Sequence, residues 1–295
     1  MNVVVVVGDA GLDVIARHER DIVWGGDSRA KIRLTGGGSG ANTALWLAAT
    51  GTGTTLMARV GDDAGGRLIR SELEAAGVRC AFTVDPEVAT CCIVVLVDRE
   101  GQRSMLPDRG ANARFCPEDV DPAAFGDATH LHLSGYVLLD PSSRPGGLAS
   151  LAAAREAGLT TSVDPQAAAL LTDPQAFLDD VRGVDLLLPN TDELIALTGS
   201  AEPAAAAELL GTVGAVAVTS GLSGASWVDA DGVVSVSADD SACVDSTGAG
   251  DAFNAGVLSA WLQGESTVDA LLAGTRLGGR AVSQVGAQPE AFSRR

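Results

Sequence analysis

The sequence predicts an α/β fold: a three-layer sandwich in which a mostly parallel central sheet is flanked by helices and carries a small β-sheet lid. Three observations predict it: the apolar run Val3–Val7, helical segments that alternate with short apolar segments, and two stretches that break this alternation. An uninterrupted β-branched run is typical of a strand buried on both faces, and alternating strands and helices indicate βαβ units. We expect a single domain over residues 1–295.

Helical segments recur along the chain, and each stops at a glycine, a residue that readily adopts the left-handed conformation that ends a helix. The three clearest are Asn42–Thr50, Gly66–Ala76 and Leu148–Ala157. Strands are expected where short apolar runs end in turn-forming residues. The clearest of these are Leu159–Val163, Val184–Leu188 and Ala215–Thr219. An alanine-rich helix near Pro203–Leu210 and a hairpin over Ala225–Val236 complete the pattern.

Two stretches, at about residues 13–35 and 89–107, do not fit the alternation of strands and helices. The first is polar with short alternating pieces, and the second holds the apolar run Cys91–Val97, a turn and a return strand. Both patterns predict hairpin strands outside the main sheet. We expect them to form one lid over the carboxyl edge of that sheet, where ligands of such folds bind. The apolar strand also predicts a homodimer formed through the lid.

The net charge of −18 restricts the classes of partner. A strongly acidic surface repels nucleic acid and anionic lipid, so we expect neither as a partner. The opening residues carry no basic leader and no run reaches the apolar length of a membrane span, so we expect a cytoplasmic protein with no membrane partner.

The cysteines and histidines do not predict a metal site. Five cysteines are an odd number with no Cys-x-x-Cys pair, and we expect reduced, mostly buried thiols. His130 and His132 alternate along an expected strand, but His18 is the one further histidine. We therefore expect a hydrogen-bonding role in the core for this pair.

Two glycine-rich motifs precede expected helices. The first, Gly36–Asn42, runs into the helix that begins near Asn42; a plain loop with Asn42 as the helix cap explains it equally well. The second, Asp245–Asp251, follows a short expected strand at Cys243–Val244 and precedes an apolar helix at Ala252–Leu262. The backbone amides of residues 248–251 predict an anion-binding nest, strengthened by the helix dipole.

Asp251, at the end of the second motif, predicts phosphoryl transfer. This reaction needs positioning and charge neutralisation more than covalent chemistry, so one base beside one anion hole is a sufficient catalytic core. On this hypothesis the nest holds the transferring phosphoryl group and Asp251 accepts the proton of the attacking hydroxyl. The alternative is a first-turn carboxylate that only stabilises its helix.

Taken together, the motifs Gly37-Gly38-x-x-x-Asn42-x-Ala44 and Asp245-Ser246-Thr247-Gly248-Ala249-Gly250-Asp251 resemble the two signatures of the ribokinase-like (PfkB) carbohydrate kinase family. The resemblance covers nearly the whole chain. It implies an ATP-dependent sugar kinase that transfers the γ-phosphoryl group to a hydroxyl of a small carbohydrate. It assigns Asp251 as the general base and Gly248, Ala249 and Gly250 to the anion hole.

The resemblance implies further contacts with the sugar, the nucleotide and Mg²⁺. The implied sugar contacts are Asp9, Gly11, Asp13, Gly38 and Asn42. The implied nucleotide contacts are Asn190, Thr219, Gly221 and Gly224. Glu193 is implied to support Mg²⁺ through water; the alternative is structural, because Asn190 and Glu193 also have the spacing of a helix capping box.

A monovalent-cation site, with K⁺ as the expected ion, is also implied by the resemblance. The matching positions are Asp245, Thr247, Ala281, Gln284 and Gly286, partly through backbone carbonyls. Glu290 stands where ribokinase has a small hydroxyl residue, which leaves either a different ligand or no site.

The substrate is inferred by elimination. Gly135 stands where ribokinase has an acidic residue, which argues against ribose. Arginines in or near the lid, among them Arg33 and Arg109, would suit a sugar phosphate, but surface arginines are common and we expect an uncharged sugar. The alternatives are a nucleoside kinase of the same fold and a catalytically silent sugar-binding protein. The missing Gly-x-Gly-x-x-Gly and Gly-Lys-Ser/Thr motifs exclude a dinucleotide-binding dehydrogenase and a P-loop kinase.

Overall fold

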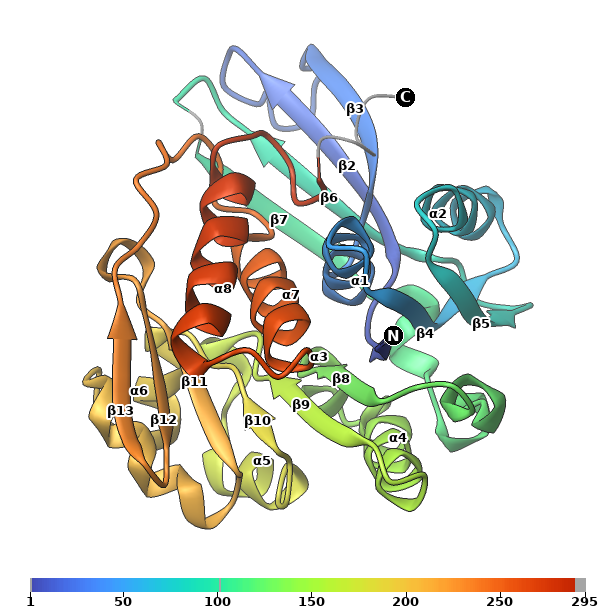
Figure 1. The fold of residues 1–295 in the computed structure, drawn as a ribbon. Helices are drawn as coiled ribbons and strands as arrows, with labels where there is room; N and C mark the ends of the chain where they lie inside the picture. The colour runs from blue at the N-terminus through green and yellow to red at the C-terminus, as the bar shows by residue number, and fades with distance from the viewer. Residues whose placement is uncertain (1, 101, 290–295) are drawn as a thin grey trace.

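A nine-stranded sheet forms the middle layer of the computed structural model, which describes residues 2–100 and 102–289 (Figure 1). Its strands, in spatial order, are β13 (Gly232–Val236), β12 (Ala225–Asp229), β11 (Ala215–Thr219), β10 (Leu186–Leu187), β9 (Thr160–Asp164), β8 (His130–Ser134), β1 (Val3–Val7), β4 (Gly53–Gly61) and β5 (Arg79–Asp85). The strands from β11 to β5 run parallel, and the predicted hairpin adds β12 and β13 as an antiparallel edge.

Strand β1 packs against a helical layer on each face, as its sequence predicts. Val4 and Val6 belong to one hydrophobic core, and Val5 and Val7 belong to the other. Each fully buried side chain of this kind stabilises the fold by about 1.5–3 kcal/mol. The first face is covered by α1 (Ser39–Ala49), α2 (Ala64–Ala75), α7 (Ala249–Trp261) and α8 (Thr267–Val282). The second is covered by α3 (Tyr136–Leu139), α4 (Arg144–Glu156), α5 (Pro174–Asp180) and α6 (Thr191–Thr198).

The lid is a separate four-stranded sheet, as predicted. Its strands, in spatial order, are β3 (Ala30–Gly37), β2 (Gly11–His18), β6 (Cys91–Val97) and β7 (Arg103–Asp108). Strands β2 and β6 pair in parallel, and the two outer pairs are antiparallel. In Figure 1 the lid lies beyond α1 and the start of α7. The sheet coincides with the two predicted insertions to within a few residues.

The predicted helices form, but they begin a few residues earlier than expected. Helix α1 begins at Ser39 where Asn42 was expected, and α7 begins at Ala249 where Ala252 was expected. The expected starts lie at the candidate cap Asn42 and at the first apolar residue after the second glycine motif, Ala252. The first turn of a helix, however, leaves its amides without intrahelical partners and therefore accepts glycine and polar residues. This shift places Asp251 inside the first turn of α7.

Two short elements differ from the prediction. No strand forms at Cys243–Val244, because the amides of Val244 and Asp245 donate to the Val282 carbonyl at the end of α8, at 2.7 and 3.1 Å, instead of pairing with a strand. The alanine-rich segment is a 3₁₀ helix, Pro203–Gly211. Its first turn is closed by the bond from the Ala205 amide to the Glu202 carbonyl.

The prediction for the cysteines is partly wrong. All five thiols are free, but only Cys91 is fully buried, and Cys243 is exposed. Cys80 and Cys92 are half-buried. Cys80 lies in β5, the edge strand of the main sheet, and Cys92 lies in the lid sheet, so neither is enclosed by the layers of the core.

His130 and His132 lie in the core, as predicted. His130 hydrogen-bonds to the hydroxyls of Thr160 and Ser162 at 2.8 and 2.7 Å, and His132 bonds to Ser162 at 2.8 Å. Within residues 2–100 and 102–289, no cluster of three or more histidine, cysteine or acidic side chains has the arrangement of a metal site. The same residues contain no helix with the length and hydropathy needed to span a bilayer.

Candidate active site

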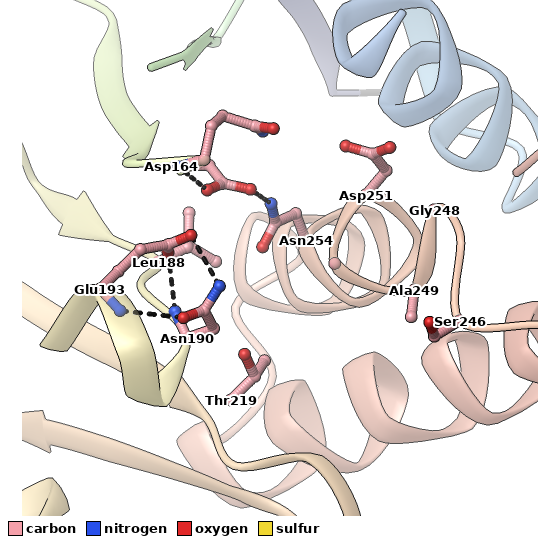
Figure 2. Close-up of a pocket in the computed structure, with 12 residues that line it drawn as sticks. Asp164, Leu188, Asn190, Glu193, Thr219, Ser246, Gly248, Ala249, Asp251 and Asn254 are labelled. Carbon is pink, nitrogen blue, oxygen red and sulfur yellow. Dashed lines mark hydrogen bonds between the residues drawn. The ribbon is translucent and has the colours of Figure 1, made fainter. Parts of the chain in front are cut away.

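Two cavities meet at the carboxyl ends of the parallel strands, and Asp251 lines both of them together with Gly248 and Gln166. The first, of about 210 Å³, we call the small cavity; Figure 2 shows its walls. It is lined by Asp164, Gln166, Leu188, Asn190, Glu193, Thr219, Ser246, Gly248, Ala249, Gly250, Asp251 and Asn254. The second, of about 750 Å³, we call the lid cavity. It lies between the lid strands and the start of α1, and Asp13, Gly38, Asn42, Glu72 and Tyr136 are among its lining residues.

The amino end of α7 forms part of the wall between the two cavities. Gly248 caps the helix in the left-handed conformation, with φ +75°, and a Cβ at this position would lie 2.7 Å from Ala287. Only glycine fits both requirements. The Ala249 amide donates to the Ser246 carbonyl at 3.3 Å, whereas the amides of Gly250 and Asp251 have no acceptor among the described residues. The predicted nest therefore has fewer available amides than residues 248–251 would supply, but those of Gly250 and Asp251 can still donate to an anion.

The Asp251 carboxylate is buried and held by two side chains of α1. Oδ2 accepts a hydrogen bond from Asn42 Nδ2 at 3.2 Å, and Oδ1 accepts one from the Thr43 hydroxyl at 3.3 Å. Burial, and secondly the charge of Asp164, raise the pKa of Asp251 to about 7, while these hydrogen bonds act in the opposite direction. A carboxylate with a pKa near neutral pH is well matched to accepting and releasing protons.

Activity is therefore expected to depend on the ionisation of Asp251. A general base works only when deprotonated, so kcat/KM should fall about tenfold for each pH unit below about 7. A pH profile of initial rates at saturating nucleotide tests this expectation. An activity that stays level down to pH 5 would show that burial does not raise this pKa in the working enzyme.

Asp164 and Glu193 bring two more carboxylates to the small cavity. Burial raises the pKa of Asp164 to about 6; burial, and secondly Asp164, raise the pKa of Glu193 to about 8. Asp164 accepts hydrogen bonds from the Asn254 side-chain amide and from the Gln166 backbone amide. Two neighbouring buried carboxylates are stabilised by a cation, and carboxylate and water oxygens suit Mg²⁺. The donor set of the small cavity therefore fits this ion.

Asn190 and Glu193 form the capping box that was the structural alternative. Asn190 Oδ1 accepts a hydrogen bond from the Glu193 amide, and Glu193 Oε2 accepts one from the Asn190 amide, both at 2.9 Å. The two side chains also line the small cavity, together with Thr219, so the cap does not exclude a ligand role. Gly221 and Gly224 lie in the turn after β11 and line neither cavity.

The predicted sugar contacts divide into two groups. Asp13, Gly38 and Asn42 line the lid cavity, and burial raises the pKa of Asp13 to about 6. Asp9 and Gly11 line neither cavity. The Asp9 carboxylate instead forms a half-buried ion pair with Arg109 at 2.7 Å, and this arginine also pairs with Asp140. Gly11 is covered by Cys91, which a Cβ on the glycine would approach to 2.5 Å.

The residues of the implied monovalent-cation site are gathered around one turn. Asp245 accepts hydrogen bonds from the amides of Thr247 and Gly286 at 2.8 and 2.9 Å. Gln284 donates from its side chain to the Gln288 carbonyl at 2.6 Å, and Ala281 is buried in α8. Glu290 lies outside the described residues.

Sequence reasoning missed Asp164, Asn254 and Thr43 as site residues. Asp164 had one available signal, since it is the last residue of a parallel strand and such ends meet at the ligand-binding edge. Asn254 lies one helical turn beyond Asp251, so the same face of α7 carries both side chains. Thr43 had no signal, because its contact joins segments far apart in the chain.

Comparisons with known proteins show the family of this chain. The family model described as "pfkB family carbohydrate kinase" matches residues 1–292. An ATP-dependent ribose-1-phosphate kinase of Halopiger xanaduensis is 34% identical over 260 residues, which cover 86% of this chain and 83% of that protein. A fructokinase of Vibrio alginolyticus is 29% identical over 269 residues, covering 88% and 84%.

Solved structures show the same fold. The ribokinase of Thermotoga maritima superposes with a TM-score of 0.84 at 25% identity over 100% of both chains. The Arabidopsis thaliana ribokinase, complexed with ribose and ATP, superposes with a TM-score of 0.81 at 28% identity, covering 97% of this chain and 95% of that one. The chain therefore belongs to the PfkB family of carbohydrate kinases and is a phosphotransferase with an alcohol group as acceptor.

Proposed function

We propose that this enzyme transfers the γ-phosphoryl group of ATP to a hydroxyl of a small uncharged sugar. Asp251 is the general base, and the unpaired amides within residues 248–251 form the anion hole. One observation carries the proposal: the buried Asp251 carboxylate lines both cavities, between the sugar-side groups of the lid cavity and the carboxylates of the small cavity. A base in this place reaches a hydroxyl on one side and a phosphoryl group on the other.

The sugar is held in the lid cavity by acceptors that have no protein partner. Asp13 Oδ1 and Asn42 Oδ1 are buried and unpaired among the described residues, and both accept hydrogen bonds from sugar hydroxyls. Asn42 also donates to Asp251, so one residue orients the substrate and the base together. Closure of the lid excludes water from the attack on the phosphorus.

The chemical step is a single in-line displacement. Asp251 takes the proton of the sugar hydroxyl as the hydroxyl oxygen forms a bond to the γ-phosphorus, and the bond from that phosphorus to the bridging oxygen of ADP breaks. Backbone amides at the start of α7 donate to the phosphoryl oxygens, whose negative charge the helix dipole also stabilises.

ATP and Mg²⁺ are assigned to the small cavity. Mg²⁺ bound with ATP neutralises phosphate charge, and Asp164 and Glu193 are the carboxylates that would hold it, directly or through water. Asn190 and Thr219 lie beside them. An Escherichia coli putative ribokinase II, 23% identical with a TM-score of 0.88, is described in complex with ATP and Mg²⁺. We assign K⁺ to the turn formed by Asp245, Thr247 and Gly286.

A sugar phosphate is the second candidate substrate. Arg17, Lys31 and Arg33 line the lid cavity from the lid strands, in a chain whose net charge is −18. The Halopiger xanaduensis relative is named for a phosphorylated pentose. A nucleoside is the third, because the lid strands present Ile15, Val95 and Met105 to the cavity and Tyr136 lies opposite.

A coupled assay of ADP release, run with sugars, sugar phosphates and nucleosides, tests the proposal. We expect turnover with an uncharged sugar, no more than slow turnover with its phosphate, and none without acceptor. A phosphate preferred over its parent sugar would identify the second candidate. Sugar binding with no ADP release from any acceptor would identify a silent binding protein and overturn the proposal.

We also propose that the enzyme is a homodimer joined through the lid. Cross-strand register places Val14, Leu34, Val94 and Leu106 on one face of the lid sheet, and of these four only Leu34 also lines the lid cavity. Leu34 and Leu106 are 51% and 59% exposed. An apolar sheet face without a covering layer is typical of a protein interface.

Replacing Leu106 with glutamate should convert the dimer to a monomer, because a charge on this face cannot be desolvated cheaply. Light scattering on the eluting protein measures the mass. Val233→Glu, at an exposed position of strand β13, is the matched control and should leave the dimer intact. A wild-type protein that runs with the mass of one chain would refute the dimer.

A further inference from the structure

The buried polar atoms that lack a partner are concentrated at the two cavities. Among the described residues there are six such side-chain atoms, and five belong to cavity-lining residues. The five are Asp13 Oδ1, Asn42 Oδ1, Glu72 Oε2, Gln166 Nε2 and Gln288 Nε2. Each such atom costs the fold about 1–3 kcal/mol unless a ligand or water satisfies it. Their common location indicates where ligand polar groups bind.

Glu72 and Gln288 are distinct from the other three because they play no part in the proposed chemistry. Asn42 touches Asp251, and Gln166 lines both cavities with it, whereas Asp13 is a predicted sugar contact. Glu72 comes from α2, and Gln288 comes from the segment that follows α8. Neither side chain has a function in the site as described so far.

The two side chains converge beside Gly36, at the base of lid strand β3. A Cβ on Gly36 would lie 2.6 Å from Gln288 Nε2 and 2.7 Å from Glu72 Oε2, so both atoms lie close to the same point beside this glycine. Both side chains line the lid cavity at this point. Glu72 Oε2 and Gln288 Nε2 nevertheless have no hydrogen-bond partner, including each other.

Gln288 lies on a backbone segment that two hydrogen bonds hold in place. Its backbone carbonyl accepts a hydrogen bond from the Gln284 side chain at 2.6 Å. The carbonyl of the preceding residue, Ala287, accepts one from the Trp46 indole at 2.9 Å. The backbone that carries Gln288 is therefore pre-positioned, which lowers the conformational entropy that is lost when a ligand binds to this side chain.

We propose that Glu72 and Gln288 form a second substrate-binding pair, which recognises a sugar hydroxyl other than the one that is phosphorylated. Glu72 Oε2 accepts a hydrogen bond and Gln288 Nε2 donates one, and a hydroxyl is the group that both donates and accepts. A phosphate at the same place would meet the Glu72 carboxylate without a proton to share. The pair therefore selects a polyol at this end of the lid cavity; the inference rests on the proposed function.

The test compares Glu72→Gln with wild type in the ADP-release assay, using the best sugar and its series of single-deoxy analogues. Losing a hydrogen bond to a charged group should raise KM about 10- to 100-fold. The value of kcat should change little, because Glu72 does not contact Asp251 or its partners. Glu74→Gln is the matched control: Glu74 lies on the same helix, is exposed and pairs with Arg70, and its loss should leave KM unchanged.

The deoxy analogues distinguish recognition from a structural role. For one deoxy analogue, the KM of wild type should rise by the same factor by which Glu72→Gln raises the KM for the full sugar. The KM of Glu72→Gln should not rise further when that analogue replaces the full sugar. Gln288→Met, which keeps the side-chain size, should show the same KM effects with the same analogue, because Gln288 is the other member of the pair. The pair would be overturned if the KM effects of the variant and of the missing hydroxyl multiplied for every analogue. It would also be overturned if KM were unaffected in both variants.

Failure of this inference is separable from failure of the proposed function. If wild type released no ADP with any acceptor, the kinase assignment would fail on its own. Thermal shift with the sugar panel would then measure the pair through binding alone, with Glu72→Gln again expected to weaken the stabilisation by the full sugar but not by one analogue. Equal shifts for wild type and variant would refute the pair.

Discussion

Replacing Asp251 with asparagine should lower turnover by about 10²- to 10⁴-fold while the sugar still binds. Asparagine keeps the size of the side chain and can still meet Asn42 and Thr43, but it cannot take the proton of the attacking hydroxyl. The ADP-release assay measures the loss, and calorimetric titration of the sugar measures retained binding. A variant with wild-type turnover would remove the base from the mechanism.

Asp269→Asn is the matched control for that variant. Asp269, like Asp251, lies in the first turn of its helix, but it is exposed and bonds only to the capping Ser266. If first-turn carboxylates act only on helix stability, both substitutions should affect turnover alike. We expect Asp269→Asn to retain full activity.

Stability provides a second measurement on Asp251→Asn. The folded state raises this pKa from 3.8 to about 7, so the folded protein binds more protons than the unfolded chain between these values. Stability is therefore lost as the pH rises through this window, by up to about 4 kcal/mol above pH 7. Asparagine does not titrate, so the variant should be more stable than wild type at pH 8, with a smaller difference at pH 5. Urea unfolding at the two pH values measures this difference.

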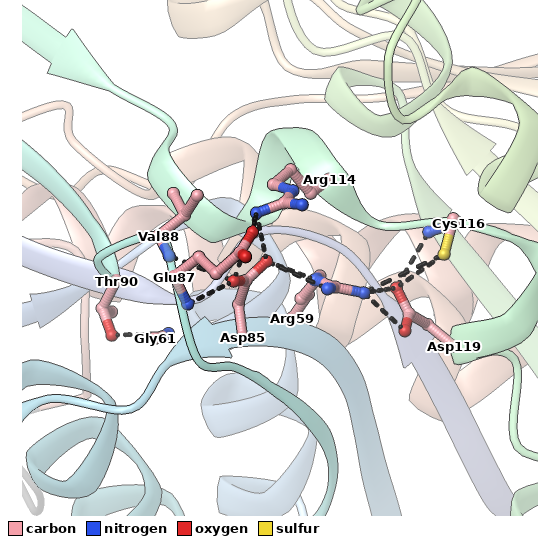
Figure 3. Close-up of polar contacts among 9 residues, drawn as sticks. All are labelled: Arg59, Gly61, Asp85, Glu87, Val88, Thr90, Arg114, Cys116 and Asp119. Atoms are coloured by element: carbon pink, nitrogen blue, oxygen red, sulfur yellow. Dashed lines mark hydrogen bonds and ion pairs between the residues drawn. The ribbon is translucent and has the colours of Figure 1, made fainter.

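Replacing Arg59 with methionine should destabilise the fold by about 3–5 kcal/mol, because buried Asp119 loses its cation and buried Asp85 keeps only the pair with Arg114 at 3.3 Å. Figure 3 shows the network: Arg59, from β4, bonds to Asp85 at 2.9 Å and to Asp119 at 2.9 Å. The two carboxylates are 0% and 4% exposed. Urea unfolding at neutral pH measures the loss.

The control for this substitution is Arg182→Met. Arg182 pairs with Asp179 at 2.8 Å, but both side chains are more than half exposed, so its loss should cost less than about 1 kcal/mol. Equal effects of the two substitutions would show that burial of the Arg59 network has no energetic consequence.

The Arg59 network also fixes the entry of the chain into the lid. Asp85 accepts hydrogen bonds from the amides of Glu87 and Val88 at 2.9 and 3.0 Å, shortly before lid strand β6 begins at Cys91. Loosening this connection should raise the KM for sugar in Arg59→Met, because β6 supplies Ile93 and Val95 to the lid cavity.

Most of the fold could be predicted from local patterns in the sequence. The apolar run of β1, the glycines that end helices and the two irregular stretches each depend on residues close together in the chain, and each predicted the right element. The glycine motif before Asp251 likewise predicted the start of α7. The lost strand at Cys243–Val244 shows the limit, because a partner distant in sequence, the end of α8, decides the conformation there.

The site was predictable only where a motif marks it. Glu72 has the sequence of an ordinary surface glutamate in an amphipathic helix, and only the three-dimensional fold brings it to Gln288. Asp9 is a second case: its carboxylate pairs with Arg109, which lies one hundred residues further along the chain, too far for a local pattern to reveal the pair. Burial and contacts between distant residues decide the role of both side chains, and neither can be recognised from the neighbouring sequence.

The contact of Gly248 with Ala287 joins late parts of the chain at the site, and this affects when the enzyme can become active during its synthesis. The start of α1 supplies Asn42, while α7 and the segment after α8 supply Asp251 and Gln288, so the site unites the early and the late parts of the chain. A chain still emerging from the ribosome lacks the late part. Activity should thus arise only after Gln288 has left the ribosome, and the half-made protein, unable to bind its ligands tightly, would consume no nucleotide until then.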